Sequence, residues 1–162
     1  MKKLIVANWK KNPDSEEKAR ELFSATKKGI ENIQEVDVVI CPPYQYLSLL
    51  SEEGMVLGAQ DFQTEVKNFN VKYVIVGHSD MRKIGETNEV INKKIKSTLA
   101  DNMTPIFCVG EHEGENRKEV LEQQLAEGLK DIEDISNIII AYEPTWAIGT
   151  GNNCSVEETK KS

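Results

Sequence analysis

The sequence predicts a parallel α/β fold built from repeated βα units, and three observations support this prediction. Short apolar runs alternate with amphipathic segments at a spacing of roughly 20 to 35 residues. Polar side chains with reactive groups directly follow several of the apolar runs. No linker or low-complexity tract interrupts the 162 residues, so we expect one domain over residues 1–162 with one sizeable core.

Six segments are predicted to be strands because each is short, apolar and rich in β-favouring residues. They are residues 3–7, 36–41, 55–59, 73–76, 104–109 and 137–142. Their alternation with helical segments favours βα units over a β-sandwich or a helical bundle.

Two helices are predicted from residues that can cap a helix N-terminus. Asp14 with Glu17 resembles a capping pair for a helix that ends near Glu31. Thr87 can cap a helix over residues 88–100 in the same way.

A third helix is expected over residues 115–129, which place four apolar side chains on one face: Val120, Leu121, Leu125 and Leu129. Residues 61–72, between the third and fourth strands, leave room for only one or two helical turns around residues 64–68.

Composition and charge argue against several classes of protein. The net charge of -7 disfavours a nucleic-acid surface and long-range attraction of an anionic substrate, so local groups must hold any phosphate. Lys2 and Lys3 precede an apolar run too short for a signal peptide, and no stretch approaches the length of a membrane span. Cys41, Cys108 and Cys154 form no CxxC pair, so we expect reduced thiols and a cytoplasmic location.

The run AYEPTWAIGTG at residues 141–151 is the most informative part of the chain. Pro144 disfavours the helical region for Glu143, so the carboxylate lies at a defined strand exit. Gly149 and Gly151 can absorb large dihedral changes. This layout is typical of a catalytic base beneath a closing lid, although an isolated Glu-Pro pair is more simply interpreted as a βα turn.

Two further strand exits carry reactive groups, Lys10 in the tripeptide NWK and His78 in the tripeptide GHS. The carboxyl ends of parallel strands converge, so Lys10, His78 and Glu143 can face one ligand. Taken singly, Lys10 would be a solvated surface lysine and His78 a loop histidine with satisfied hydrogen bonds. Only their combination with Glu143 favours an active site.

Five motifs occur in the order known from one enzyme family: NWK at 8–10, GAQ at 58–60, YVIVGHS at 73–79, CVGE at 108–111 and YEPTWAIGTG at 142–151. From residue 4 to its end, the sequence therefore resembles the triosephosphate isomerase family. The resemblance implies a (β/α)8 TIM barrel, with six of the eight strands present in this sequence. It also implies cofactor-free interconversion of D-glyceraldehyde 3-phosphate and dihydroxyacetone phosphate through an enediolate, a reaction of glycolysis and gluconeogenesis.

The resemblance assigns a role to each candidate catalytic residue. Glu143 would be the base, and His78 would polarise the carbonyl and shuttle protons between the two substrate oxygens. The helix expected to begin directly after His78 disfavours a positive charge on its ring. Lys10 would stabilise the enediolate and bind the phosphate, Asn8 would donate to a substrate oxygen, and the N–H of Gly149 would bind a phosphate oxygen.

Two features depart from the family pattern. Asp80 stands where the family has a glutamate that pairs with the active-site lysine, so it would hold Lys10 only after a small backbone adjustment, and Met81 replaces an arginine. Residues 61–72 are too few for the family's third loop and helix, which carry its usual dimer contact. A homo-oligomer is therefore not expected to form through that contact.

Six strands fall short of the eight that this barrel needs. We expect the carboxyl-terminal part of the barrel to be missing from residues 1–162. A further segment of the gene product, or a partner chain, would then supply the last two strands and the remaining phosphate-binding loops. An open sheet closed by oligomerisation is an alternative, because unpaired edge strands favour association.

Neither a metal nor a cofactor is expected. Cys108 and His112 show a loose C-x3-H spacing but lack the further ligands of a zinc site. We expect Cys108 instead to pack near Glu143 as a small buried side chain.

The sequence leaves two other functions open beside the isomerase of triose phosphates. One is a catalytically silent barrel fragment, or βα assembly module, that needs a complementing segment. The other is a different phosphosugar enzyme on the same fold, which the particular lid sequence disfavours. We expect a small-molecule triose phosphate as the partner, and neither nucleic acid nor a membrane.

Overall fold

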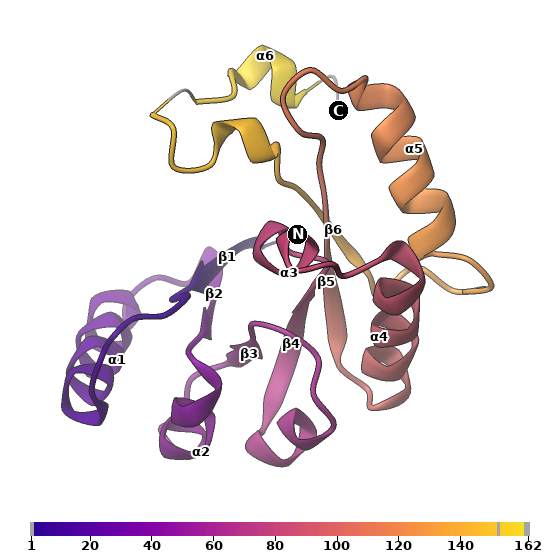
Figure 1. The fold of residues 1–162 in the computed structure, drawn as a ribbon. Coiled ribbons are helices and arrows are strands. Elements are labelled where there is room, and N and C mark those ends of the chain that lie inside the picture. Colours follow the sequence, from indigo (N-terminus) through magenta and orange to yellow (C-terminus); the bar gives the residue numbers. More distant parts are fainter. Residues whose placement is uncertain (1, 152, 161–162) are drawn as a thin grey trace. The chain divides into compact units, whose positions relative to one another are not determined.

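The structure is a computed structural model that describes residues 2–151 and 153–160. The described residues divide after Val74 into two compact units. In both units strands alternate with helices along the chain, as the sequence predicts (Figure 1).

Parallel strands that pair in chain order form the centre of the first unit. These strands are β1 (Lys3–Asn8), β2 (Val36–Cys41), β3 (Leu57–Ala59) and the first part of β4 (Val71–Val76). The pairing of β1 with β2 runs from Lys3 opposite Val36 to Asn8 opposite Cys41. Strand β3 pairs with β2 at a single position and with β4 in a register that shifts after Leu57.

Four short or medium helical elements connect these strands: α1 (Glu16–Ile30), the 3-10 turn η1 (Tyr44–Tyr46), α2 (Leu47–Leu50) and the 3-10 helix η2 (Thr64–Phe69). The element η2 confirms the short helical segment predicted between the third and fourth strands. The pair η1 and α2 was not predicted, because its four-residue helix is too short to show an apolar period. Ala19 and Phe23 are the buried residues of α1.

The predicted N-terminal cap of α1 is wrong. Ser15, not Asp14, is the N-cap: its Oγ accepts a hydrogen bond of 3.3 Å from the N–H of Lys18. Asp14 instead pairs with the Lys18 ammonium at 2.7 Å. Two adjacent residues could each cap this helix. The backbone places Ser15 in the extended conformation that an N-cap requires, so the helix begins one residue later.

The second unit contains the end of β4 and a parallel pair of strands, β5 (Thr104–Val109) and β6 (Ile139–Tyr142), in register from Ile106 opposite Ile139 to Val109 opposite Tyr142. The helices are α3 (Ser79–Lys83), α4 (Asn88–Ala100), α5 (Arg117–Gly128), the 3-10 turn η3 (Thr145–Ala147) and α6 (Val156–Thr159). Helices α4 and α5 pack on each other and on β5 (Figure 1).

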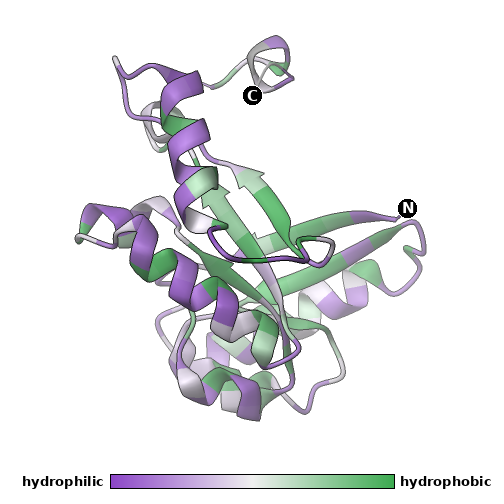
Figure 2. Cartoon of the chain, turned by 90° about the vertical axis from the view of Figure 1, so that its right-hand side faces the viewer, coloured by the Kyte–Doolittle hydropathy of each residue, from purple (hydrophilic) through white to green (hydrophobic). Residues whose placement is uncertain are grey.

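The core of the second unit lies where α4 meets β5. Ile91 and Ile95 of α4 and Phe107 of β5 are fully buried. Figure 2 shows that the strands are mainly hydrophobic, whereas α4 and α5 carry hydrophilic residues over much of their length. The four apolar residues predicted to share one face of α5 are all half-buried.

The strand predictions hold in number and order for the described residues, with shifts at some ends. β2 and β5 have the predicted bounds, β4 begins two residues earlier at Val71, and β1 extends through Asn8. β6 begins two residues late because the N–H of Ile138 bonds to the carbonyl of Ile135 in a turn and is not available to the sheet. Among the described residues, no helix combines the length and apolarity needed to cross a bilayer.

The end of α5 depends on Asn92, a buried residue of α4. Its amide nitrogen donates to the carbonyls of Gly128 and Lys130 at 2.8 and 2.9 Å. Replacing Asn92 by Ala leaves both carbonyls without this donor, and we expect a loss of about 1–3 kcal/mol in the free energy of unfolding. Urea denaturation followed by circular dichroism measures the loss. The exposed neighbour Lys93→Ala is the matched control, and an equal loss there would contradict the role of Asn92.

Candidate active site

His78 and Glu143 lie together in the second unit, close to the carboxyl ends of two strands. His78 follows β4 through Gly77, and Glu143 is the residue after β6. The distance from His78 Nε2 to Glu143 Oε1 is 3.0 Å, and their side chains are 11% and 21% exposed. The chain thus brings together two of the predicted catalytic residues, which are 65 positions apart in the sequence.

The hydrogen bonds of His78 define its tautomer. His78 is the N-cap of α3, and its Nδ1 accepts a bond of 3.1 Å from the N–H of Asp80. A carboxylate oxygen of Asp80 is 3.5 Å from the same nitrogen, which is a longer approach, so the backbone N–H is the partner. Since Nδ1 accepts, the ring proton is on Nε2 and is directed to Glu143.

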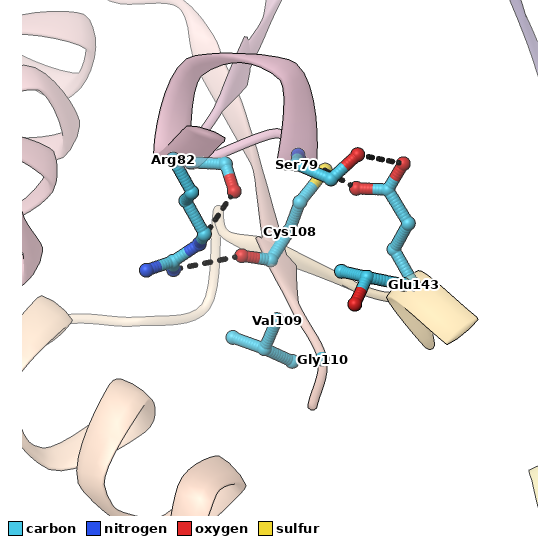
Figure 3. A pocket seen from close by; sticks show the side chains of 8 residues that line it. Ser79, Arg82, Cys108, Val109, Gly110 and Glu143 are labelled. Carbon is cyan, nitrogen blue, oxygen red and sulfur yellow. Dashed lines mark hydrogen bonds between the residues drawn. The ribbon is translucent and has the colours of Figure 1, made fainter. Parts of the chain in front are cut away.

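Ser79 supplies two more donors to Glu143. Its N–H bonds to Oε2 at 3.0 Å and its hydroxyl bonds to Oε1 at 3.1 Å (Figure 3). The helix start predicted directly after His78 is confirmed, whereas the contact of Ser79 with Glu143 was not predicted. The signal was present, because the first N–H groups of a helix lack partners within the helix.

These bonds decide the charge of Glu143. Burial opposes ionisation of the carboxyl group, but the bonds from His78 and from the N–H and hydroxyl of Ser79 outweigh burial and lower its pKa below 4.5. Glu143 is therefore a carboxylate at neutral pH, as a general base must be.

Arg82 ties three segments together behind this pair. Its guanidinium donates to the carbonyl of Gly77 at 2.8 Å and the carbonyl of Cys108 at 3.2 Å (Figure 3). It also donates to Oδ1 of Asn88 at 2.7 Å. Because one guanidinium bonds both strand exits, it fixes the end of β4 against the end of β5. This role of Arg82 was not predicted, because a basic residue in a polar turn carries no local sign of burial.

Cys108 lies beside Arg82 and Glu143 in the same small hollow (Figure 3). It is buried, and burial together with the negative charge of Glu143 raises the pKa of its thiol to about 12, although Arg82 acts in the opposite direction. The thiol is thus protonated at neutral pH, so Cys108 is a packing residue here and not a nucleophile. None of the three cysteines takes part in a disulfide bond among the described residues.

Glu111 anchors the segment that follows Glu143. Its Oε1 accepts bonds from the hydroxyl of Tyr142 at 3.0 Å and from the indole N–H of Trp146 at 2.8 Å. Its backbone carbonyl accepts from both the N–H and the hydroxyl of Thr145 at 3.0 Å. The Glu111 side chain thereby fixes the start of the predicted lid.

The far end of the predicted lid is more exposed. Gly149 and Gly151 have φ values of 71° and 75°, a left-handed conformation that other residues rarely adopt. Both are exposed. The segment is therefore anchored at Trp146, whereas a Cβ built on Gly149 or Gly151 would meet no atom beyond the neighbouring residues within 4 Å.

Asn8 and Lys10 belong to the first unit, where they form a turn after β1. The Lys10 N–H bonds to Oδ1 of Asn8 at 2.9 Å, and Lys10 has a φ of 53°, unusual for a residue with a side chain. The amide of Gln60 holds this turn by donating to the carbonyls of Lys10 and Cys41, each at 2.9 Å. Gln60 lies in the GAQ motif at 58–60, but the sequence alone predicted no role for it.

In the described part of the chain, no group of three or more His, Cys, Asp or Glu residues is arranged so that it could hold a metal ion. His112 Nδ1 instead lies 2.7 Å from the hydroxyl of Thr145.

Comparison with known proteins matches this arrangement to one family. The family model for triosephosphate isomerase matches residues 3–162. The triosephosphate isomerase of Dictyoglomus thermophilum is 40% identical over an alignment of 186 positions that covers 99% of this chain and 74% of that protein. Those of Alkaliphilus oremlandii and Idiomarina loihiensis are 36% and 33% identical and are covered over 73% and 71% of their lengths.

The order of strands and helices, together with these matches, confirms the predicted fold class, a (β/α)8 TIM barrel represented in the described residues by six strands. The chain belongs to the triosephosphate isomerase family.

Proposed function

We propose that this chain is an aldose–ketose isomerase that interconverts D-glyceraldehyde 3-phosphate and dihydroxyacetone phosphate by proton transfer through an enediolate. The observation that carries the proposal is the 3.0 Å contact between His78 Nε2 and the Glu143 carboxylate, in a chain of the triosephosphate isomerase family. A base and a hydrogen-bond donor at one point are what removal of a proton next to a carbonyl requires.

Glu143 is the proposed base and His78 the proposed electrophile. Because the ring proton is on Nε2 and Nδ1 is occupied by the Asp80 N–H, the imidazole can donate to a substrate oxygen at the position that Glu143 Oε1 occupies. The enediolate oxygen that gains charge then receives this donor.

Glu143 must break some of its present hydrogen bonds before it can act on a substrate. Both of its oxygens accept bonds from Ser79, and one also accepts from His78. The described geometry is thus a resting arrangement. Substrate binding has to replace the Ser79 bonds, and the segment from Trp146 to Gly151 is proposed to close over the site as this happens.

The remaining roles follow from family membership. Lys10 is proposed to stabilise the enediolate and the phosphate, Asn8 to donate to a substrate oxygen and Gly149 to bind a phosphate oxygen through its N–H. Asp80 is proposed to support Lys10, in addition to the bond that its N–H makes to His78. No cofactor takes part in the proposed reaction.

We place the reaction in glycolysis and gluconeogenesis and the protein in the cytoplasm. The proposed partner is a triose phosphate, without nucleic acid or membrane. A homo-oligomer would use a surface other than the segment from residue 61 to residue 72, whose helical part is the six-residue η2.

The base assignment predicts the effect of Glu143→Gln, which keeps the size of the side chain but removes the proton acceptor. We expect kcat to fall at least ~10³-fold while KM changes far less, because the loss concerns the transition state. A coupled isomerase assay measures both constants. Glu113→Gln, an exposed change in a neighbouring loop, is the control. Retention of more than about a tenth of the parental turnover would remove Glu143 from this role.

The role of Lys10 predicts a contrast between two adjacent lysines. Lys10→Met should lower kcat/KM by about 10²- to 10³-fold, whereas Lys11→Met should leave it near the parental value, because only Lys10 is proposed to face developing charge. Steady-state kinetics of the two variants, prepared together, make the comparison. Equal losses would identify Lys10 as an ordinary surface residue.

The bonds to Glu143 predict a pH effect of Ser79→Ala. The folded-state pKa of Glu143 lies below 4.5, so its ionised form stabilises the fold above that pH, and this stabilisation is lost as the pH falls through the lowered pKa. Removing the Ser79 hydroxyl raises the folded-state pKa and reduces that contribution. We therefore expect acid unfolding of Ser79→Ala to begin at a higher pH than that of the parent.

Circular dichroism during acid titration measures this shift, with the exposed change Ser24→Ala as control. An acid transition of Ser79→Ala that coincides with the parental one would show that the hydroxyl contributes nothing to the charge state of Glu143.

A further inference from the structure

Gln124, a half-buried residue of α5, pairs its side-chain amide with the backbone of Gly110. Its Oε1 accepts the Gly110 N–H at 2.8 Å, and its Nε2 donates to the Gly110 carbonyl at 3.0 Å. Both bonds of one amide thus go to one residue. A residue of a neighbouring antiparallel strand would bond both backbone groups in this way, and here a side-chain amide takes its place.

Gly110 in turn lies against the backbone of Glu143. A Cβ placed on Gly110 would be 1.9 Å from the Glu143 carbonyl oxygen and 2.5 Å from its carbonyl carbon, so no other residue fits without movement of one segment. On either side of this contact, the Val109 carbonyl accepts the Glu143 N–H at 2.8 Å and the Glu111 carbonyl accepts the Thr145 N–H at 3.0 Å. The segments 109–111 and 143–145 are therefore fastened together beyond the strand ends.

These contacts form a continuous chain from α5 to the proposed base. Successive peptide groups of an extended segment face opposite sides, so the carbonyls of Val109 and Glu111 face Glu143 and Thr145 while the Gly110 groups face away. Gln124 bonds these outward groups. Gly110 is thereby held between the amide of Gln124 and the backbone of Glu143.

We propose that Gln124 is a positioning residue for Glu143: through Gly110 it sets the place of the Glu143 backbone relative to His78 and Ser79. The inference rests on the proposed function, because it assumes that the position of Glu143 matters for turnover. Gln124 lies on another element from the reacting groups and acts only through Gly110. No part of the proposed reaction requires it to touch substrate.

The hydrogen bonds of Glu143 tolerate little displacement of its side chain. Glu143 meets its donors at 3.0 to 3.1 Å, and a hydrogen bond weakens steeply when its geometry is disturbed. Without Gln124, the buried N–H and carbonyl of Gly110 lose their partners, and the loop has to move to satisfy them. Since Gly110 is in contact with Glu143, this movement carries the base with it.

Two variants test the proposal. Gln124→Met keeps the length of the side chain without its amide, and Gln124→Asn keeps the amide but shortens its reach by one methylene. We expect either change to lower kcat about 10- to 100-fold with little change in KM, since small displacements of a catalytic group have effects of this size. Gln123→Met is the matched control, because Gln123 is exposed and bonds Glu127 on the same helix at 2.9 Å.

A second readout reports the position of Glu143 without catalysis. The carboxyl carbon of Glu143 is followed by NMR through a pH titration of the full chain. Ser79 and His78 donate to this carboxylate, and the guanidinium of Arg82 and the protonated thiol of Cys108 line the same hollow. Displacement of Glu143 weakens the donors that keep its titration midpoint low. The midpoint should therefore rise in both Gln124 variants and stay at the parental value in Gln123→Met.

The two readouts separate this inference from the proposed function. If the parent chain has no isomerase activity, the proposed function fails and the NMR midpoint alone decides the role of Gln124. Folded Gln124 variants with an unchanged midpoint overturn the positioning role, whatever their turnover. A raised midpoint with parental kcat in an active chain also overturns it. Should Gln124→Met fail to fold by circular dichroism, the more conservative Gln124→Asn carries the test.

Discussion

The charge on Glu143 is the constraint on which the rest of the second unit depends. A half-buried carboxylate is unfavourable unless donors offset the loss of water. Those donors come from a different strand exit: His78 and Ser79 lie where β4 ends and α3 begins. The register of β5 with β6 then has to bring Glu143 to that point. The start of α3, the close approach at Gly110 and the ionisation of Glu143 are therefore parts of one arrangement.

The same hydrogen bonds that keep Glu143 ionised would also limit it in the proposed role of general base. A lowered pKa means a weaker affinity for the proton that the reaction transfers, and each bond to a charged group contributes about 1.5–3 kcal/mol that must be given up when the carboxylate moves. In the proposed reaction, binding of the substrate and closure of the predicted lid would supply this free energy. In the proposed mechanism, Glu143 becomes a stronger base only after it leaves the two donors of Ser79.

The strands and the reactive residues after them were predictable because both signals are local. An apolar run such as residues 104–109 identifies its own strand, and a Glu-Pro pair after such a run identifies its own exit. Parallel topology then brings the exits together without further information. Strand ends were less predictable, because they depend on competing bonds, such as the turn that takes the Ile138 N–H away from β6.

The supports of the site were not predictable for a related reason. The bond from Ser79 to Glu143 spans 64 residues, that from Arg82 to Cys108 spans 26, and in each case one partner is a backbone or hydroxyl group that every sequence offers in abundance. The role of Gln124 is equally absent from the sequence, because a glutamine on a helix is ordinarily solvated. Its contact with Gly110 is visible only in the structure. The reactive groups of such a site can thus be recognised from their order along the chain. The groups that hold them in place become recognisable only when the backbones they bind have been located.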